Sequence, residues 1–193
     1  MTVASEDLPE LRTLLDQNDA AGFEFPILTI AGLEHHPAAT GDVNTCVVLA
    51  HDGRVLHTHH KITRYGGEDA ESGEWVEGIV TGAEVTVLES PIGNLSPLIC
   101  RDLFHELVSP LVVGSHANVL AVPSLSPKTS AHESAAYRFL ASNGAATLVC
   151  NRWFDDTGRT GTFILLPGKS VDGKRTLFER LGTAAAALVC SVE

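Results

Sequence analysis

Hydrophobic residues fall in short runs separated by Gly, Pro, Asn and Asp, a pattern typical of buried strands bounded by turns. Runs at 26–32, 43–50 and 55–57 predict three strands, and the Asp52-Gly53 pair before the third run indicates a hairpin turn. Further strands are predicted at 84–88, 96–100, 118–123, 146–151, 162–166 and 184–192.

Three segments show helical character instead. Leu8, Leu11, Leu14 and Leu15 follow Ser5 at spacings of three and four, and the range 130–143 ends at an Asn143-Gly144 stop signal. A third helix is expected over 102–113, although Pro110 should bend it or end it early. The range 62–82 is rich in Gly and Glu and is interpreted as a long loop. Strand–helix–strand units among paired strands predict an α/β layered fold with a mixed sheet, in a single domain over 1–193.

Composition narrows the function classes. The chain has 193 residues, 44% of them hydrophobic, and 13 basic against 24 acidic residues give a net charge of −11. An acidic chain without a basic stripe is a poor match to nucleic acid or to an anionic membrane, so neither is expected as a partner. The four cysteines form no CxxC pair, and the N-terminus shows no signal-peptide pattern. A reduced, cytoplasmic protein is expected.

The segment 93–106 carries the most informative chemistry. An apolar strand ends at Cys100, and a helix is expected to start directly after it. Backbone N–H groups at a helix start favour a thiolate and can hold a developing oxyanion. The alternative is that Cys100 is a small buried hydrophobic residue, which is the commoner fate of a cysteine.

The segment 98–106, LICRDLFHE, resembles the nucleophile segment of the carbon–nitrogen hydrolase (nitrilase/amidase) family. The range 117–124 is similar to the family's next strand, which runs into a Pro-Ser pair. Upstream, the order of 31–34, 44–48 and 52–56 before His59-His60-Lys61 resembles the approach to the family's catalytic lysine. With the later ranges 135–144 and 148–152, the resemblance covers about residues 26 to 192, and the order of the pieces is more specific than any one piece.

This resemblance implies a nitrilase-like α-β-β-α sandwich and a set of site residues. Cys100 matches the nucleophile, and Lys61 matches the lysine that stabilises the tetrahedral intermediate. Glu68 matches a second glutamate that positions the site, and the backbone N–H of Arg101 matches an oxyanion donor. Simpler readings remain: Lys61 as a solvated charge, Glu68 as part of an acidic loop, and Asp102 as a helix cap.

The sequence departs from the family where its catalytic base should lie. That base is a glutamate in a Pro-Glu pair after an early strand, and only Pro9-Glu10 offers the dipeptide, at the start of a predicted helix. We therefore expect the fold to be N-terminally truncated, without its first βαβ unit, and Glu10 is a weak candidate base. Two hypotheses follow: a thiol-dependent hydrolase of a small amide or nitrile, or an inactive or truncated nitrilase-like module that serves assembly or regulation. A native chain longer than this sequence is a third explanation.

The histidines and the expected truncation bear on possible cofactors and partners. Histidines cluster along one part of the chain: His35, His36, His57, His59 and His60. Neighbouring histidines on a strand point to opposite faces, and no spacing matches a zinc signature, so neither a metal nor another cofactor is expected. Loss of an edge unit should expose strand edges or apolar surface, which predicts a homo-oligomer or a partner domain.

Overall fold

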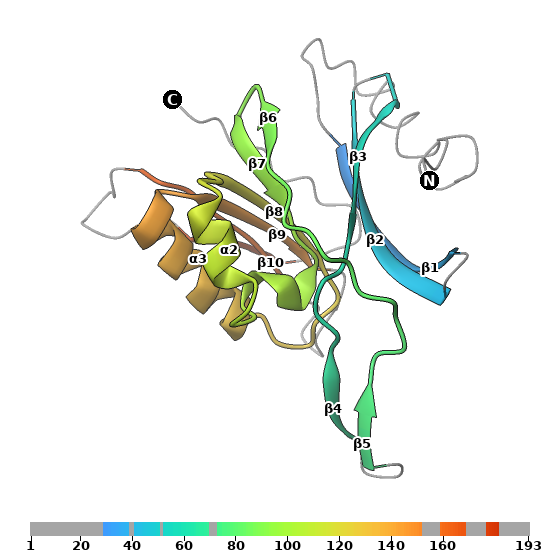
Figure 1. Cartoon of the computed structure of the whole chain (residues 1–193). Helices are drawn as coiled ribbons and strands as arrows, with labels where there is room; N and C mark the ends of the chain where they lie inside the picture. The colour runs from blue at the N-terminus through green and yellow to red at the C-terminus, as the bar shows by residue number, and fades with distance from the viewer. Residues whose placement is uncertain are drawn as a thin grey trace. The chain divides into compact units, whose positions relative to one another are not determined.

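The computed structural model describes residues 29–38, 41–50, 52–69, 73–151, 159–168 and 177–181. The chain divides into two compact units, and the boundary in the sequence falls between Glu84 and Val85. The two units are described separately below (Figure 1), and the expectation of a single domain stays a prediction. The helix expected after Ser5 and the strand expected at 184–192 lie outside the described residues.

In the first unit, three antiparallel strands form a sheet in the order β1-β2-β3. They are β1 (Thr29–Ala38), β2 (Gly41–Leu49) and β3 (Val55–His60). The predicted hairpin between β2 and β3 is confirmed: Gly53 adopts φ 80°, and the Asp52 carboxylate accepts a hydrogen bond from the Arg54 N–H at 3.1 Å. The apolar run of β2 is buried from Val43 to Leu49, so the central strand anchors this sheet.

The prediction of a long loop over 62–82 is wrong in part. Two short strands, β4 (Gly66–Asp69) and β5 (Gly73–Val76), pair as an antiparallel hairpin within this range. Local pairing of this kind needs no apolar periodicity, so the pattern did not reveal it. The strand predicted at 84–88 is also misplaced, because regular pairing begins only at β6 (Leu88–Ser90).

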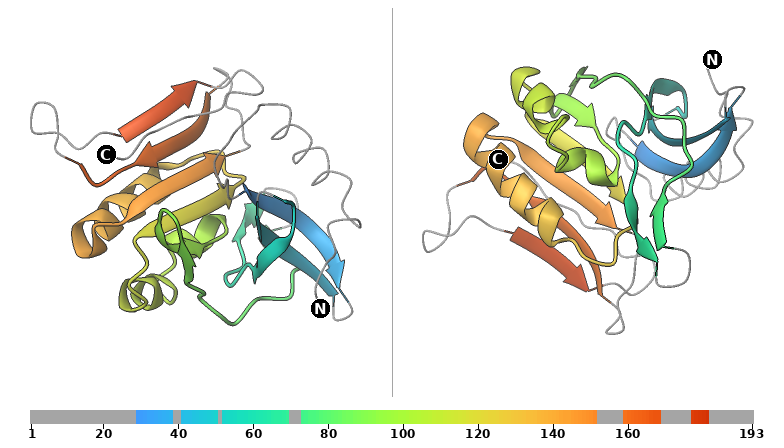
Figure 2. Two further views of the ribbon diagram at one scale, coloured as in Figure 1. Left: turned by 90° about the horizontal axis from the view of Figure 1, so that it is seen from above. Right: turned by 60° about the horizontal axis from the view of Figure 1, so that its bottom comes forward.

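In the second unit, six strands form a mixed sheet in the order β11-β10-β9-β8-β7-β6 (Figures 1 and 2). After β6 come β7 (Gly93–Pro97), β8 (Val119–Ser124), β9 (Ala146–Asn151), β10 (Arg159–Leu165) and β11 (Leu177–Leu181). β7, β8 and β9 run parallel, and the remaining pairs are antiparallel. The predicted α/β fold with a mixed sheet is confirmed.

The helices of this unit lie over one face of its sheet (Figure 1). α3 (Ser130–Asn143) has the predicted bounds and ends at Gly144 in a left-handed conformation, φ 64°. The helix predicted over 102–113 is wrong as a single element. A 3₁₀ turn, η2 (Cys100–Leu103), precedes a separate short helix, α2 (Ser109–Gly114), and Pro110 lies in the first turn of α2, where its missing N–H costs nothing.

One face of α3 is buried against the sheet of this unit. Ala135, Phe139 and Leu140 are buried, and so is the whole apolar run of β8 from Val119 to Val122. Together they form the core between the helix and the sheet of this unit. In the described part of the chain, none of the helices combines the length and the apolar character needed to cross a lipid bilayer.

Candidate active site

Cys100 occupies a strained turn at the end of β7. The strand continues through buried Leu98 and Ile99, and the Leu98 N–H still donates to the Ala121 carbonyl of β8 at 3.0 Å. The chain then turns sharply, and Cys100 adopts φ 47°. A left-handed conformation is unfavourable for a residue with a Cβ, and such strain concentrates at functional sites. The turn leaves Cys100 partly exposed although its neighbours Leu98 and Ile99 are buried.

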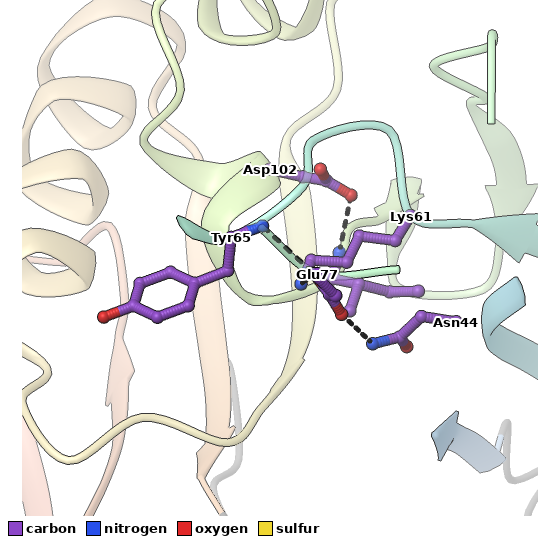
Figure 3. Close-up of polar contacts among 6 residues, drawn as sticks. Asn44, Lys61, Tyr65, Glu77 and Asp102 are labelled. Carbon is purple, nitrogen blue, oxygen red and sulfur yellow. Dashed lines mark hydrogen bonds and ion pairs between the residues drawn. The ribbon is translucent and has the colours of Figure 1, made fainter. Parts of the chain in front are cut away.

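The buried side chain of Asp102 closes this turn. Its Oδ2 accepts a hydrogen bond from the Ile99 N–H at 3.2 Å, and its own N–H donates to the Ile99 carbonyl at 3.0 Å (Figure 3). The structure therefore supports the capping interpretation of Asp102. The helix that follows Cys100 is only the four-residue η2, so the helix dipole acting on the thiol is much weaker than the sequence predicted.

The described cysteines differ sharply in their surroundings. None of Cys46, Cys100 and Cys150 forms a disulfide. Burial raises the pKa of the Cys46 thiol to about 12, so this sulfur stays protonated and unreactive. Cys150 is an exposed residue, yet desolvation of its sulfur raises the pKa of that thiol as well. Among these three described cysteines, only Cys100 combines partial exposure with a left-handed backbone.

Lys61 follows the last residue of β3 and lies between two neighbouring segments. Its N–H donates to the Asn44 carbonyl, and its carbonyl accepts from the Gly82 N–H, both at 2.8 Å. The residue is 4% exposed, which overturns the simpler reading of Lys61 as a solvated charge at a strand end. A buried ammonium needs a charged partner, and the first unit supplies one.

That partner is Glu77, whose Oε2 lies 2.5 Å from the Lys61 Nζ (Figure 3). The Tyr65 N–H donates to the same oxygen at 3.0 Å, and the Asn44 side-chain amide donates to Oε1 at 3.4 Å. Burial alone would raise the pKa of Glu77, but these hydrogen bonds and the Lys61 charge outweigh it and hold the pKa below its ordinary value. The carboxylate is therefore ionised at neutral pH and keeps Lys61 oriented.

Sequence reasoning did not single out Glu77 as the partner of Lys61, and the positioning role that the resemblance implies for Glu68 stays a prediction. The backbone of Glu68 lies in β4 opposite Glu74, and its side chain is not among the described ones. Glu77 carries no motif, because it follows β5 in a segment without regular structure. The acidic composition of 68–77 was the available signal, and it could not select one carboxylate. Glu10 lies outside the described residues, and the role of the Arg101 N–H stays a prediction.

Three histidines lie in β3: His57, His59 and His60. His60 pairs across the sheet with Thr45, and its Nδ1 lies 3.0 Å from the Thr45 Oγ1. Burial and the neighbouring His59 lower the pKa of His57. Within the described ranges, no group of three or more His, Cys, Asp or Glu side chains is placed to hold a metal ion.

The sequence matches no protein-family model, and no curated protein matches it. Solved structures do resemble it. A mutant amidase from Nesterenkonia sp. AN1, with the acetamide moiety of fluoroacetamide added covalently at its active-site cysteine, has a TM-score of 0.61 and 20% identity over 86% of this chain. An alanine mutant of the same amidase, described as from the nitrilase superfamily, gives 0.62 and 20% identity over 92% of this chain and 66% of its own. The C. elegans NitFhit protein gives 0.63 and 17% identity over 83% of this chain and 41% of its own.

These similarities show the fold. The chain has the α/β fold of the nitrilase-superfamily amidases, as the sequence resemblance implied. It spans 62% of the length of the first of these structures.

Proposed function

We propose that this chain is a carbon–nitrogen hydrolase-like protein that cleaves a small amide or nitrile with Cys100 as its nucleophile. One observation carries the proposal: Cys100 lies in a strained, partly exposed turn at the carboxyl ends of parallel strands. Open α/β sheets place their ligands at this edge. The likeness to an amidase whose active-site cysteine takes up an acetamide group supports the same chemistry.

The proposed reaction on an amide has two stages. The Cys100 sulfur gives its proton to a base and attacks the amide carbon, which forms a C–S bond and a tetrahedral oxyanion. The oxyanion collapses, the C–N bond breaks, and the nitrogen leaves with a proton as ammonia. Water, deprotonated by the same base, then attacks the thioester, releases the carboxylic acid and returns the proton to Cys100. A nitrile joins this route after addition of the thiol across the triple bond and of one water.

Lys61 and Glu77 complete the proposal from the first unit. The role that the family resemblance implies for Lys61 is to stabilise the developing negative charge and to favour the thiolate of the nucleophile. The ionised Glu77 holds the Lys61 side chain in place, a positioning function of the kind that the resemblance implies for Glu68. The N–H of Arg101 is the proposed second donor to the oxyanion.

The reaction needs a base that takes the proton of Cys100 and later activates water. Glu10, a carboxylate from elsewhere in the chain, or a residue from a partner chain would supply it. The competing function is an inactive nitrilase-like module used for assembly or regulation, which the lack of a family-type Pro-Glu strand end favours. A homo-oligomer or a partner domain in a cytoplasmic setting fits both functions, and light scattering at micromolar concentration tests the oligomer.

Ammonia release from a panel of small amides and nitriles tests the hydrolase function. The intact chain should release ammonia from at least one compound, Cys100→Ala should abolish the release, and the matched Cys150→Ala should retain it. No release from any compound, or release that survives Cys100→Ala, would leave the non-catalytic module as the better account.

A further inference from the structure

Three neighbouring parallel strands of the second unit end at the same edge of the sheet. The register pairs Pro97 of β7 with Ala121 of β8, and Ser124 of β8 with Asn151 of β9. Cys100 follows Pro97 by three residues, and Ser124 follows Ala121 by three residues. Cys100, Ser124 and Asn151 therefore lie at or just beyond the ends of the adjacent strands β7, β8 and β9. Figure 1 shows these three strands side by side.

The segment 124–129, which links β8 to α3, is clamped at this edge by Asn151. The Asn151 Oδ1 accepts a hydrogen bond from the Ser126 N–H at 2.9 Å, and its Nδ2 donates to the Ser126 carbonyl at 2.8 Å. This amide therefore pairs with both backbone groups of one residue, as a neighbouring strand would. Asn151 itself is 4% exposed, so its side of the two bonds is shielded from water, while Ser126 is half-buried.

Further contacts fix both the clamp and the clamped segment. The Thr162 hydroxyl of β10 accepts from the Asn151 N–H at 3.0 Å, which holds the backbone that carries the amide. The Ser124 hydroxyl lies 3.3 Å from the Nε2 of buried His132. Gly161 of β10 lies close to Thr129, the last residue of the segment 124–129. A Cβ at Gly161 would lie 2.7 Å from the Thr129 Oγ1.

We propose that Asn151 is a positioning residue that fixes the segment 124–129 as one wall of the pocket in which Cys100 reacts, and that this wall limits the size of the substrate. The inference rests on the proposed function only for the reactivity of Cys100. Between the buried Ser124 and the clamped Ser126, Leu125 remains 43% exposed. The wall therefore presents an apolar side chain from a backbone that cannot move freely.

Asn143 provides a matched control. Its Nδ2 donates to the Val113 and Ala117 carbonyls at 3.2 and 3.5 Å, so Asn143→Ala also removes two side-chain hydrogen bonds to backbone. Ala117 precedes β8, so these bonds lie at the opposite edge of the sheet from Cys100. A comparison of Asn143→Ala with Asn151→Ala therefore distinguishes the general effect of losing two hydrogen bonds from the specific effect of releasing the segment 124–129.

The experiment measures how fast Cys100 is alkylated by iodoacetamide and by its bulkier N-phenyl derivative, on the intact chain, with peptide mass spectrometry as readout. Asn151→Ala should raise the rate with the bulky reagent relative to the small one by about tenfold, the scale of discrimination by a fitted pocket. Asn143→Ala should leave that ratio unchanged. A ratio unaffected by Asn151→Ala, or shifted equally by both variants, would overturn the inference. An unreactive Cys100 in the unmodified chain would instead contradict the proposed function.

A second variant keeps the test open if Asn151→Ala does not fold. Leu125→Trp enlarges an exposed side chain of the wall and should lower the bulky-to-small ratio, whereas Leu107→Trp, at a residue 71% exposed and outside the wall, should not. An unchanged ratio in Leu125→Trp would also overturn the inference.

Discussion

The Nζ of Lys61 and the Oε2 of Glu77 lie 2.5 Å apart, and both side chains are largely buried, with 5% and 11% of their surface exposed. Removing one partner of a buried ion pair is costly, because the other charge stays buried without a counter-charge. The pair therefore fixes the ammonium that the proposed chemistry requires.

Glu77→Gln should lower the free energy of unfolding by about 3 kcal/mol, since Lys61 would stay buried without its counter-charge. Because the pKa of Glu77 lies below its ordinary 4.5, its stabilisation is present above that value and is lost as the pH falls below it. Urea unfolding should show this loss in the unmodified chain and a smaller loss in Glu77→Gln.

Asp52→Asn serves as the control for Glu77→Gln. It removes an ion pair with Arg54 whose side chains are more than half exposed, and the expected change is below about 0.5 kcal/mol. Equal effects of the two variants would mean that the Lys61–Glu77 pair contributes no more than a surface pair.

Gly82→Ala should displace the segment that holds the Lys61 backbone. A Cβ at Gly82 would overlap the His60 carbonyl oxygen, which cannot give way as a flexible side chain would. We expect a loss of about 1–3 kcal/mol in unfolding free energy, the usual cost of overpacking. Gly78→Ala, where no heavy atom lies within 4 Å of the new Cβ, should be neutral or slightly stabilising. Equal stability of the two variants in urea unfolding would contradict this role of Gly82.

The backbone at Cys100 can be tested with small residues. Because φ is 47° there, Cys100→Gly should be more stable than Cys100→Ala by about 1 kcal/mol. At Cys150, inside β9, the order should reverse, since glycine weakens a strand. Thermal unfolding of the four variants gives both differences, and an alanine advantage at both positions would rule out strain at Cys100.

His132 should make stability depend on pH. Burial lowers the pKa of this histidine from 6.5 to about 4, so the unfolded chain takes up a proton at a higher pH than the folded one. The stabilisation is complete above 6.5 and is lost as the pH falls toward 4. Between about pH 7 and about pH 5 the loss should amount to about 2 kcal/mol. His132→Asn, which keeps a polar group near Ser124 but does not titrate, should show a flatter profile in urea unfolding; an unchanged profile would assign the dependence to other groups.

Hydrophobic runs predicted the central strands β2 and β8, because the burial of these strands follows directly from their apolar residues. The same runs misplaced β6 and β7 along the chain and did not predict β11. The range of α3 was predicted to the residue, since Asn143-Gly144 gives a local stop signal. The break between η2 and α2 was not predicted, because the chain composition over 102–113 is compatible with a helix and the left-handed turn at Cys100 is set by tertiary packing.

The candidate site was predicted only where local chemistry marks it. Cys100 was selected because it ends an apolar strand, and Lys61 was selected because of its position in the ordered set of family-like segments. Glu77 and Asn151 did not, because each acts through a contact 16 or 25 residues away in sequence. Such long-range pairings depend on how the strands are arranged, and a single sequence pattern does not contain that information.

The proposed function requires Cys100 to be an activated nucleophile and gives Lys61 the role of assisting it. The most direct measurement is the rate of iodoacetamide alkylation of each cysteine of the intact chain at neutral pH. Cys100 should react at least about tenfold faster than Cys46 and Cys150, and Lys61→Met should slow Cys100 alone, since a nearby cation promotes the thiolate. A Cys100 that reacts no faster than Cys150, or that is indifferent to the loss of Lys61, would contradict the account.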